Sequence, residues 1–482
     1  MELYQSGETY FLRCSAFPEC RYIEKVPDHY INNIEELRNI LYKKAPNRSI
    51  IDIEDTLQLG KEQLSAFNRL ERSNDNIFIT GRAGTGKSVL LRYFVRHTSK
   101  RVIVLAPTGV AAMNVNGQTL HSFFAFDHSA LDPKDVWIND ETAKILKHTD
   151  AFIIDEISMV RSDIMECVNR KFQIALKNNK PFGGVQFIAF GDLYQLEPVI
   201  ADPEVRQYLY NNFGGAHFFY APVTQLCNLS IYELRHIYRQ KDEHFQDLLS
   251  DIRTGNPSKE IIDEINNQTR TVPEESNILT VATTNGRVDT INNERLNALS
   301  GEQYAYTAEL SGNLRECIHY TSEILKFKVG SQVMLLRNNW KDGKLIWANG
   351  TLAIVVKLTK DEIWVSINNK TYKVEQVTWD TRKHTFDEGT GKITTETIAR
   401  FTQYPLCLAW ATTIHKAQGK TFQRIIVDFG RGAFSHGQAY VALSRCESLN
   451  GLYLVKPLMR RDIIVNPVVS AYMHSANIEN EF

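Results

Sequence analysis

One stretch of the sequence has the residue types and the spacing needed to hold the phosphates of a nucleotide. It reads GRAGTGKS over residues 81–88, between an apolar run at 77–80 and a helical pattern at 88–97. Glycines in such a loop let backbone N–H groups turn toward phosphate oxygens at the positive end of the following helix, and the lysine adds a charge at the β- and γ-phosphates. The residues expected to bind the nucleotide here are Gly81, Ala83, Gly84, Thr85, Gly86, Lys87 and Ser88.

A pair of carboxylates, Asp155 and Glu156, follows another apolar run at 151–154. Beside a phosphate-binding loop, this pair suits hydrolysis. Asp155 and the Ser88 hydroxyl would hold Mg²⁺, and Glu156 would orient or activate the attacking water. The loop and the carboxylates therefore predict a site that hydrolyses a nucleoside triphosphate, with Lys87, Asp155 and Glu156 in catalytic roles.

Hydrolysis also needs positive charge on the γ-phosphoryl group, which an arginine finger can supply. The candidates are Arg239, in the run IYRQ at 237–240, and Arg445, in ALSR at 442–445. Both are expected to lie in the second half of the chain, outside the half that carries the loop. Their role then depends on closure of the two halves over the nucleotide, and such closure couples hydrolysis to movement in a motor.

The elements that must position these residues alternate between apolar runs and helical patterns, which is typical of a parallel sheet covered by helices. The apolar runs fall at 77–80, 101–106, 151–154, 186–190, 277–282 and 424–429. Between the last two, residues 329–358 and 362–377 alternate apolar and polar side chains, which predicts a small antiparallel β barrel. We therefore expect an α/β protein with two halves in tandem and a β insertion in the second half.

Length and composition describe an ordinary globular protein. The 482 residues are 43% hydrophobic and 23% charged, with 55 Lys and Arg against 56 Asp and Glu, so wholly disordered, collagen-like and coiled-coil chains are excluded. Because the net charge is near zero, nucleic acid would bind in a local groove, with modest and salt-sensitive affinity.

The sequence also bears on the compartment of the protein. No apolar run approaches the ~20 residues that span a bilayer, and no signal or transit peptide is recognisable. The seven cysteines suit reduced thiols. We expect a bacterial or phage-host cytoplasm and no membrane contact.

Further motifs follow one another in a defined order. Across residues 57–460 the chain resembles the superfamily 1 helicases, and within them the petite integration frequency branch of 5′→3′ DNA helicases. Beside the phosphate-binding loop and the Asp155-Glu156 pair, the matching runs are LGKEQ at 59–63, APTGVAA at 106–112, GQTLHSFF at 117–124, GDLYQLEP at 191–198, YRQ at 238–240, QYPL at 403–406, TIHKAQG at 413–419 and YVALSR at 440–445.

The resemblance implies two tandem RecA-like P-loop domains, a small 1B insertion and an SH3-like β-barrel 2B insertion. It places domain 1A at 56–220 with 1B at about 113–135, domain 2A at 221–320 and 400–482, and 2B at 321–399. The implied activity is ATP-dependent DNA unwinding, with 5′→3′ translocation, in replication, recombination or repair. ATP and Mg²⁺ are the implied cofactors, and single-stranded or tailed duplex DNA is the implied partner. Further replication or repair proteins are expected as partners, and a monomer is expected off DNA.

The resemblance also assigns residues to the site. Gln63 would read the adenine edge, where a planar amide can pair with N6 and N7. Gln195 would sense the γ-phosphate, and Gly419 would adjoin the nucleotide. A motor on a single strand needs polar groups along the phosphates. The residues that resemble the family's strand contacts are Pro107, Thr108, Thr119, His121, Ser122, Thr413, His415 and Lys416. We interpret the phenylalanines that follow the first of these groups as core rather than as base-stacking side chains.

Residues 1–55 stand apart from these motifs. The run YFLRCSAFPECRY at 10–22 resembles half of a zinc ribbon, but the next cysteine after Cys20 is Cys167. A four-cysteine zinc site needs a second pair. We therefore interpret this region as an N-terminal extension that contains a degenerate, metal-free ribbon.

Three other uses of the same motifs stay open. The chain could translocate and remodel protein–DNA complexes without processive unwinding, it could act on RNA, or it could be a DNA-binding scaffold with an inactive nucleotide site. A degenerate site usually lacks one of its catalytic groups, and this sequence has them all, which argues against the scaffold. The motifs do not indicate whether forks, R-loops or G-quadruplexes are preferred.

Overall fold

The computed structural model describes residues 2–6, 9–13, 23–25, 59–126, 131–200, 202–240, 242–270, 278–314, 317–341, 344–387, 392–475 and 478–479. The chain divides into two compact units, Met1–Leu57 with Trp340–Lys344, and Gln58–Asn339 with Leu345–Phe482. In the smaller unit, β1 (Glu2–Ser6), β2 (Thr9–Arg13) and β3 (Ile23–Lys25) pair antiparallel in that order. Cys14 and Cys20 of the expected ribbon lie outside the described residues.

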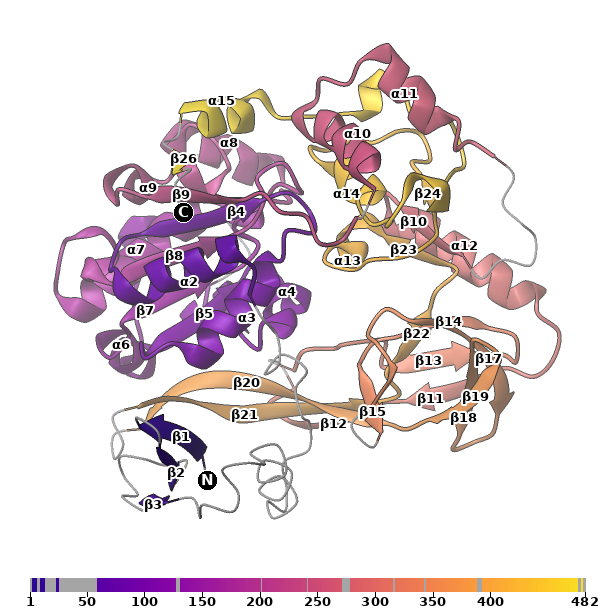
Figure 1. Ribbon diagram of the computed structural model, residues 1–482, viewed down its shortest axis with the longest axis horizontal. Helices are drawn as coiled ribbons and strands as arrows, with labels where there is room; N and C mark the ends of the chain where they lie inside the picture. The colour runs from indigo at the N-terminus through magenta and orange to yellow at the C-terminus, as the bar shows by residue number, and fades with distance from the viewer. Residues whose placement is uncertain are drawn as a thin grey trace. The chain divides into compact units, whose positions relative to one another are not determined.

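A sheet of seven parallel strands carries the phosphate-binding loop (Figure 1). Its order is β26-β9-β4-β8-β7-β5-β6, and every neighbouring pair is parallel. In chain order the strands are β4 (Ile77–Gly81), β5 (Val102–Ala106), β6 (Gln118–Thr119), β7 (Ala151–Ile154), β8 (Gln186–Phe190), β9 (Ser230–Leu234) and β26 (Ile478–Glu479). Strands β4, β5, β7 and β8 confirm the first four apolar runs.

Two strands of this sheet lie outside the range 56–220 that the resemblance implies for the first half. Strand β9 pairs with β4, and β26 pairs with β9. The last helix, α15 (Pro467–Ser475), likewise buries Val469 and Met473 in the core of this half. Neighbouring strands of a parallel sheet need not be neighbours in sequence, so the edge of the sheet does not coincide with the boundary drawn at residue 220.

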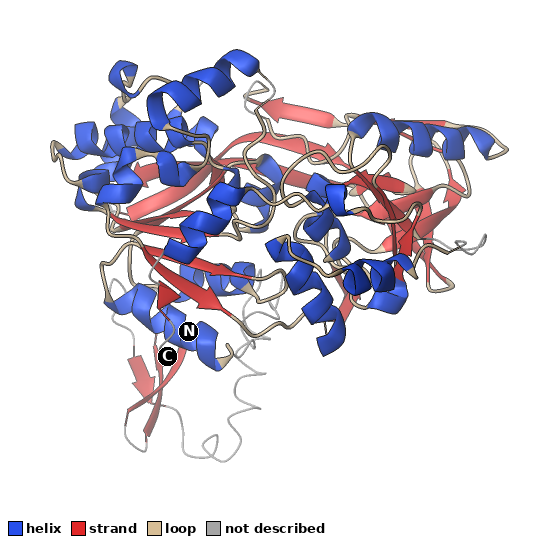
Figure 2. Cartoon of the chain, turned by 90° about the horizontal axis from the view of Figure 1, so that it is seen from above, coloured by secondary structure: helices blue, strands red, loops and turns tan. Residues whose placement is uncertain are grey.

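The sheet is buried on both faces because alternate side chains of each strand point to opposite sides. On β7, Phe152 and Ile154 join a core that includes Phe172 of α7 (Ser162–Leu176). Ile153 points the other way, into a core that includes Phe94 of α3 (Lys87–His97). Figure 2 shows helices on both sides of these strands.

The remaining helices of this half are α2 (Lys61–Arg72), α4 (Gly109–Asn114), α5 (Leu120–Phe124), α6 (Asp140–Lys147), α8 (Pro203–Phe213) and α9 (Pro222–Leu226). Short 3-10 turns in the chain are η3 (Pro133–Asp135), η4 (Ile157–Met159), η5 (Pro181–Gly184), η6 (Phe218–Tyr220), η7 (Leu449–Gly451) and η8 (Arg460–Asp462).

A second parallel sheet has the order β23-β10-β24-β25. Its strands are β10 (Leu279–Ala282), β23 (Ala411–Thr413), β24 (Ile425–Asp428) and β25 (Leu452–Leu454). Its helices are α10 (Glu243–Thr254), α11 (Lys259–Asn266), α12 (Asn285–Ala298), α13 (Ile414–Ala417) and α14 (Gln438–Leu443). Strands β10 and β24 confirm the last two apolar runs, and with them the expectation of two parallel α/β halves.

Between β10 and β23 the chain forms antiparallel strands. One sheet has the order β19-β18-β17-β14-β22, around a core that includes Phe327, Val333 and Val365. The strands of this region are β11 (Tyr304–Thr307), β12 (Glu309–Gly312), β13 (Ile324–Phe327), β14 (Gln332–Leu335), β15 (Asn339–Lys341), β16 (Lys344–Trp347), β17 (Leu352–Leu358), β18 (Ile363–Ile367), β19 (Lys370–Val374), β20 (Val377–Asp387), β21 (Lys392–Gln403) and β22 (Leu406–Leu408). The expected antiparallel pairing of the strands is confirmed, and the SH3-like class of the insertion stays a prediction.

Strands β20 and β21 form a long hairpin that the sequence patterns did not indicate. The hairpin contacts the first half through Lys383, whose Nζ donates to Glu141 Oε2 at 2.6 Å, and through the His384 backbone N–H, which donates to Gln118 Oε1 at 3.2 Å. The antiparallel region therefore touches the sheet that carries the phosphate-binding loop.

Candidate active site

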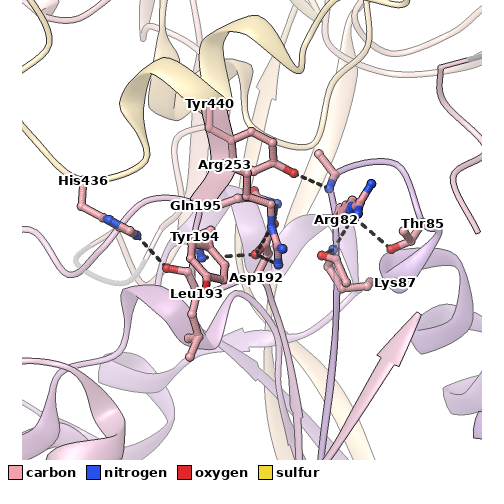
Figure 3. A network of polar contacts seen from close by, with 12 residues as sticks. Arg82, Thr85, Lys87, Asp192, Leu193, Tyr194, Gln195, Arg253, His436 and Tyr440 are labelled. Carbon is pink, nitrogen blue, oxygen red and sulfur yellow. Dashed lines mark hydrogen bonds and ion pairs between the residues drawn. The ribbon is translucent and has the colours of Figure 1, made fainter. Parts of the chain in front are cut away.

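The phosphate-binding loop joins β4 to α3, as its spacing predicts. Gly86 caps α3 in the left-handed region at φ +80°, and no side chain caps this helix. Gly84 has φ +90°, and a Cβ on it would lie 2.6 Å from Cβ of Arg239, so a larger residue would be both strained and crowded. The Lys87 ammonium donates to the carbonyls of Gly81 at 2.7 Å and Arg82 at 3.0 Å (Figure 3). The loop thus presents backbone N–H groups, and its lysine lies against it.

An open cavity of about 760 Å³ lies at this loop. The predicted residues on its wall are Ala83, Gly84, Gly86, Lys87, Ser88, Glu156, Gln195, Arg239, Gly419 and Arg445. The other predicted nucleotide residues, which are buried and are not on the wall, are Gly81, Thr85, Gln63 and Asp155. Side chains from both parallel sheets therefore meet at one cavity.

The amide of Gln63 contacts the loop itself. Its Nε2 donates to the carbonyls of Thr85 at 3.5 Å and Gly86 at 3.3 Å, and its Oε1 accepts the Gly60 N–H at 3.1 Å. These contacts tie α2 to the loop. The expected contact of Gln63 with the adenine edge stays a prediction. Tyr238 has a half-exposed ring on the cavity wall. It is a second candidate for contact with the base, and the sequence did not indicate it.

The two carboxyls at the end of β7 are crowded and poorly solvated. Burial and the neighbouring Glu156 raise the pKa of Asp155 to about 7. Burial also raises the pKa of Glu156, against the effect of the Lys87 and Arg445 cations. Glu156 adopts φ +51°, in the left-handed region, which is strained for a residue with a side chain. Two such carboxyls are stabilised by a nearby cation.

An amide of the second half bridges two catalytic candidates of the first. Gln418 Nε2 donates to Glu156 Oε2 at 3.1 Å and to Gln195 Oε1 at 3.2 Å. Gln195 Nε2 in turn donates to Asp192 Oδ2 at 3.3 Å. Gln418 lies in the run TIHKAQG at 413–419, but the run alone assigns it no role, because only the fold shows which side chains it meets.

Two further contacts between the halves adjoin the loop (Figure 3). The Ala83 N–H donates to the Tyr440 hydroxyl at 2.8 Å, and Arg253 Nη2 of α10 donates to Asp192 Oδ1 at 2.9 Å. Tyr440 lies in the run YVALSR at 440–445. Arg253 lies outside the motifs of the sequence, and an arginine near a helix end gives no local signal of its partner.

The two candidate arginine fingers lie on different elements. Arg445 follows α14 and is 1% exposed, and its Nε donates to the Val441 carbonyl at 2.8 Å. Burial and the nearby Arg239 lower the pKa of Arg445, so the wall of the cavity favours an anion. Arg239 follows β9, and the N–H of its neighbour Tyr238 donates to the Gly84 carbonyl at 2.9 Å. Arg239 lies in the connection between β9 of the first sheet and α10 of the second half, and its Nη1 donates to the Ser444 carbonyl at 3.3 Å. The expectation that Arg239 belongs to the second half stays a prediction.

The residues expected to contact nucleic acid lie where parallel strands end. Pro107 and Thr108 follow β5, and Thr119 ends β6. Three of the hydroxyls cap helices or turns: those of Thr108, Thr119 and Thr413 accept the N–H groups of Ala111, Ser122 and Lys416. The structure places His121 and Ser122 in α5, and His415 and Lys416 in α13. Their contact with nucleic acid stays a prediction.

The phenylalanines beside these residues are expected to lie in the core. Phe123 and Phe124 are 3% and 1% exposed, which confirms that interpretation for both. Phe126 is half-buried, and the Lys171 ammonium lies 4.7 Å from its ring centroid.

The five described cysteines are free thiols. In the described part of the chain, no helix combines the length and the apolar character that a membrane span requires.

Two parallel α/β halves, one with a phosphate-binding loop and the other with an arginine at the same cavity, define a P-loop nucleoside triphosphatase with RecA-like halves. Comparison with known proteins narrows this class. Residues 58–262 match the PIF1-like helicase family. The chain is 32% identical over 432 residues to the ATP-dependent DNA helicase Pif1 of Bdellovibrio bacteriovorus, across 86% of this chain and 91% of that protein. The chain belongs to the PIF1-like helicase family.

Solved structures agree with this membership. The chain is similar to Pif1 from Bacteroides sp in complex with ADP-AlF4, with a TM-score of 0.79 and 33% identity, over 87% of this chain and 97% of that one. It is also similar to Bacteroides Pif1 bound to single-stranded DNA, with a TM-score of 0.65 and 35% identity over the same shares of the two chains. The RecA-like α/β fold expected from the motifs is thereby confirmed.

Proposed function

We propose that this chain is an ATP-dependent DNA helicase that translocates 5′→3′ along a single strand and unwinds duplex DNA. The observation that carries the proposal is the cavity of about 760 Å³, whose wall joins the phosphate-binding loop of one sheet to Gly419 and Arg445 of the other. A nucleotide in this cavity touches both halves, so its binding and hydrolysis change how they close. Repeated closure is the movement that a translocating motor needs.

The side chains on the wall divide the work of ATP hydrolysis. Lys87 and the loop N–H groups bind the phosphates. Arg445 and Arg239 place positive charge where the γ-phosphoryl group develops negative charge, and Glu156 accepts a proton from the attacking water or orients it. Gln195 lies beside Glu156, joined to it through Gln418, which suits a residue that responds to the γ-phosphate.

The donor set at the loop fits Mg²⁺. Ser88 is on the cavity wall and Asp155 directly follows β7. Both carry oxygen ligands of the kind that Mg²⁺ takes together with phosphate oxygens and water. The crowded carboxyls of Asp155 and Glu156 favour a cation nearby. Bound Mg²⁺ would supply charge neutralisation at the phosphates.

Single-stranded DNA is the proposed track. Polar side chains end strands in both parallel sheets, and a motor requires one set of strand contacts on each half. With 55 basic against 56 acidic residues, the affinity depends on a local groove and falls with salt. The similarity to a Pif1 protein whose structure contains single-stranded DNA supports the same choice of partner.

The test is ATP-driven unwinding of matched duplexes that carry either a 5′ or a 3′ single-stranded tail. We expect strand separation on the 5′-tailed duplex, little on the 3′-tailed one, and none by the Lys87→Ala variant. Unwinding of the 3′-tailed duplex alone contradicts the direction. ATPase activity that displaces a bound protein block without separating strands indicates a remodelling translocase, and activity confined to RNA duplexes indicates an RNA helicase.

A further inference from the structure

One buried ion pair joins the two halves beside the cavity. Arg253, near the end of α10 in the second half, donates from Nη2 to Asp192 Oδ1 at 2.9 Å and from Nε to the same oxygen at 3.3 Å. The side chains of Arg253 and Asp192 are 7% and 0% exposed. The guanidinium carbon also lies 4.3 Å from the ring centroid of Tyr194. The pair is therefore buried and lies against Tyr194 (Figure 3).

Asp192 passes this constraint to Gln195. Its Oδ2 accepts the Gln195 Nε2 group at 3.3 Å, its Oδ1 accepts the Tyr194 N–H at 3.2 Å, and its carbonyl accepts the Gln195 N–H at 2.9 Å. The amide oxygen of Gln195 faces Gln418, and Gln195 is on the cavity wall. The Asp192 carboxylate thus holds both the backbone of Tyr194 and the side chain of Gln195.

The charges around Asp192 explain why Arg253 in particular controls it. Burial alone would raise the pKa of Asp192, and the Arg253 and Lys87 cations together lower it. Lys87 lies on the phosphate-binding loop and is engaged by that loop. Arg253 is the partner that comes from the other half, so movement of α10 acts on Asp192 directly.

We propose that Arg253 is a positioning residue that couples closure of the second half to the placement of Gln195, through Asp192. This inference rests on the proposed ATPase function and adds a regulatory contact to it. When α10 moves with the second half, as a strand-dependent closure requires, Asp192 and with it the Gln195 amide shift relative to the phosphates. Stimulation of hydrolysis by single-stranded DNA then depends on Arg253, although Arg253 is not on the cavity wall.

The experiment compares Arg253→Lys, which keeps the charge but loses the forked geometry, with Arg287→Lys. Arg287 forms an ion pair within the second half alone, from Nε to Asp428 Oδ2 at 2.8 Å, with its own side chain 45% exposed and that of Asp428 3% exposed. ATPase kcat and KM are measured with and without a poly(dT) oligonucleotide. We expect Arg253→Lys to lower the DNA-stimulated kcat roughly 10- to 100-fold, the loss that misplacement of a catalytic group by about 1 Å produces. KM should stay within about threefold, and Arg287→Lys should behave as the unaltered chain.

A double-mutant comparison separates positioning from a merely structural role. If Arg253 acts through Gln195, Arg253→Lys should have almost no further effect on kcat in a Gln195→Ala background. The proposal would be overturned if the losses of kcat from Arg253→Lys and Gln195→Ala multiplied, or if Arg253→Lys and Arg287→Lys had equal kcat.

If Arg253→Lys does not fold, the double variant Arg253→Gln with Asp192→Asn removes both buried charges, and it should show the same loss of DNA stimulation. An unaltered chain without ATPase activity would overturn the proposed function together with this inference, whereas the other two outcomes count against Arg253 alone.

Discussion

The two parallel sheets differ in how the helix after their first strand begins. In the first half, α3 starts at Gly86 with no side-chain cap, so its first N–H groups point toward the cavity and can bind phosphate. In the second half, α12 starts at Thr284, whose hydroxyl accepts the Arg287 N–H at 3.3 Å. The same architecture is therefore used once as a binding loop and once as an ordinary, self-capped turn.

The second half contributes side chains instead. Arg445 is on the wall of the cavity, Gln418 bridges Glu156 and Gln195, and Arg253 pairs with a carboxylate of the first half. Backbone groups of one half and side chains of the other thus complete a single site. Only the first half therefore needs the glycine-rich sequence, whereas the second half needs the correct placement of its side chains relative to the first.

The largest effect is expected from Lys87→Ala, which removes the cation of the binding loop. Hydrolysis should fall to background, by more than the ~1000-fold that a single arginine finger is worth, because both phosphate binding and charge stabilisation are lost. The measurement is steady-state ATPase with circular dichroism to verify the fold, and exposed Lys134→Ala is the matched control. Substantial turnover by Lys87→Ala would remove the loop from its role.

The next effect tests the contribution of the second half. Arg445→Ala should lower kcat about 1000-fold, since Arg445 brings a cation from the second half to the wall of the cavity. Exposed Arg424→Ala, in the same half, should have no effect on single-turnover hydrolysis. Equal rates for the two variants would mean that the second half closes the site without taking part in the chemistry.

A smaller loss is expected from Glu156→Gln, because the amide keeps the shape of the side chain and Asp155 stays in place. Single-turnover hydrolysis should slow at least ~100-fold through loss of the base. Binding of a fluorescent ATP analogue should persist, and Glu204→Gln on the surface of α8 serves as control. Hydrolysis by Glu156→Gln at the rate of the unaltered chain would exclude Glu156 as the base.

The smallest effect concerns the capped helix of the second half. Thr284→Ala should lower the free energy of unfolding by about 1 kcal/mol, since a helix N-cap hydrogen bond is lost, and should leave kcat unchanged. Urea unfolding and ATPase assays measure the two quantities, with Thr290→Ala within α12 as control. A large loss of activity in Thr284→Ala would show that this turn, too, takes part in the site.

The sequence by itself determined the parts of this protein that are contiguous in the chain. The loop at 81–88 binds phosphate with its own backbone, so its spacing is enough to identify it. The carboxylates after β7 and the apolar runs of both sheets are local patterns in the same sense, and the structure places them as expected. The order of the motifs also predicted that Gln195, Gly419 and Arg445 belong to the nucleotide site, and these residues do meet at one cavity.

Only the tertiary structure decided which distant residues meet. Strand β9 joins the first sheet beside β4, so that Arg239 lies in the connection from this sheet to α10, and no feature of residues 230–234 shows this in advance. Arg253 and Asp192 lie 61 positions apart, and neither residue type specifies its partner. A contact between two folded halves depends on their relative placement. That placement follows from the packing of whole sheets and helices, so a local pattern does not contain it.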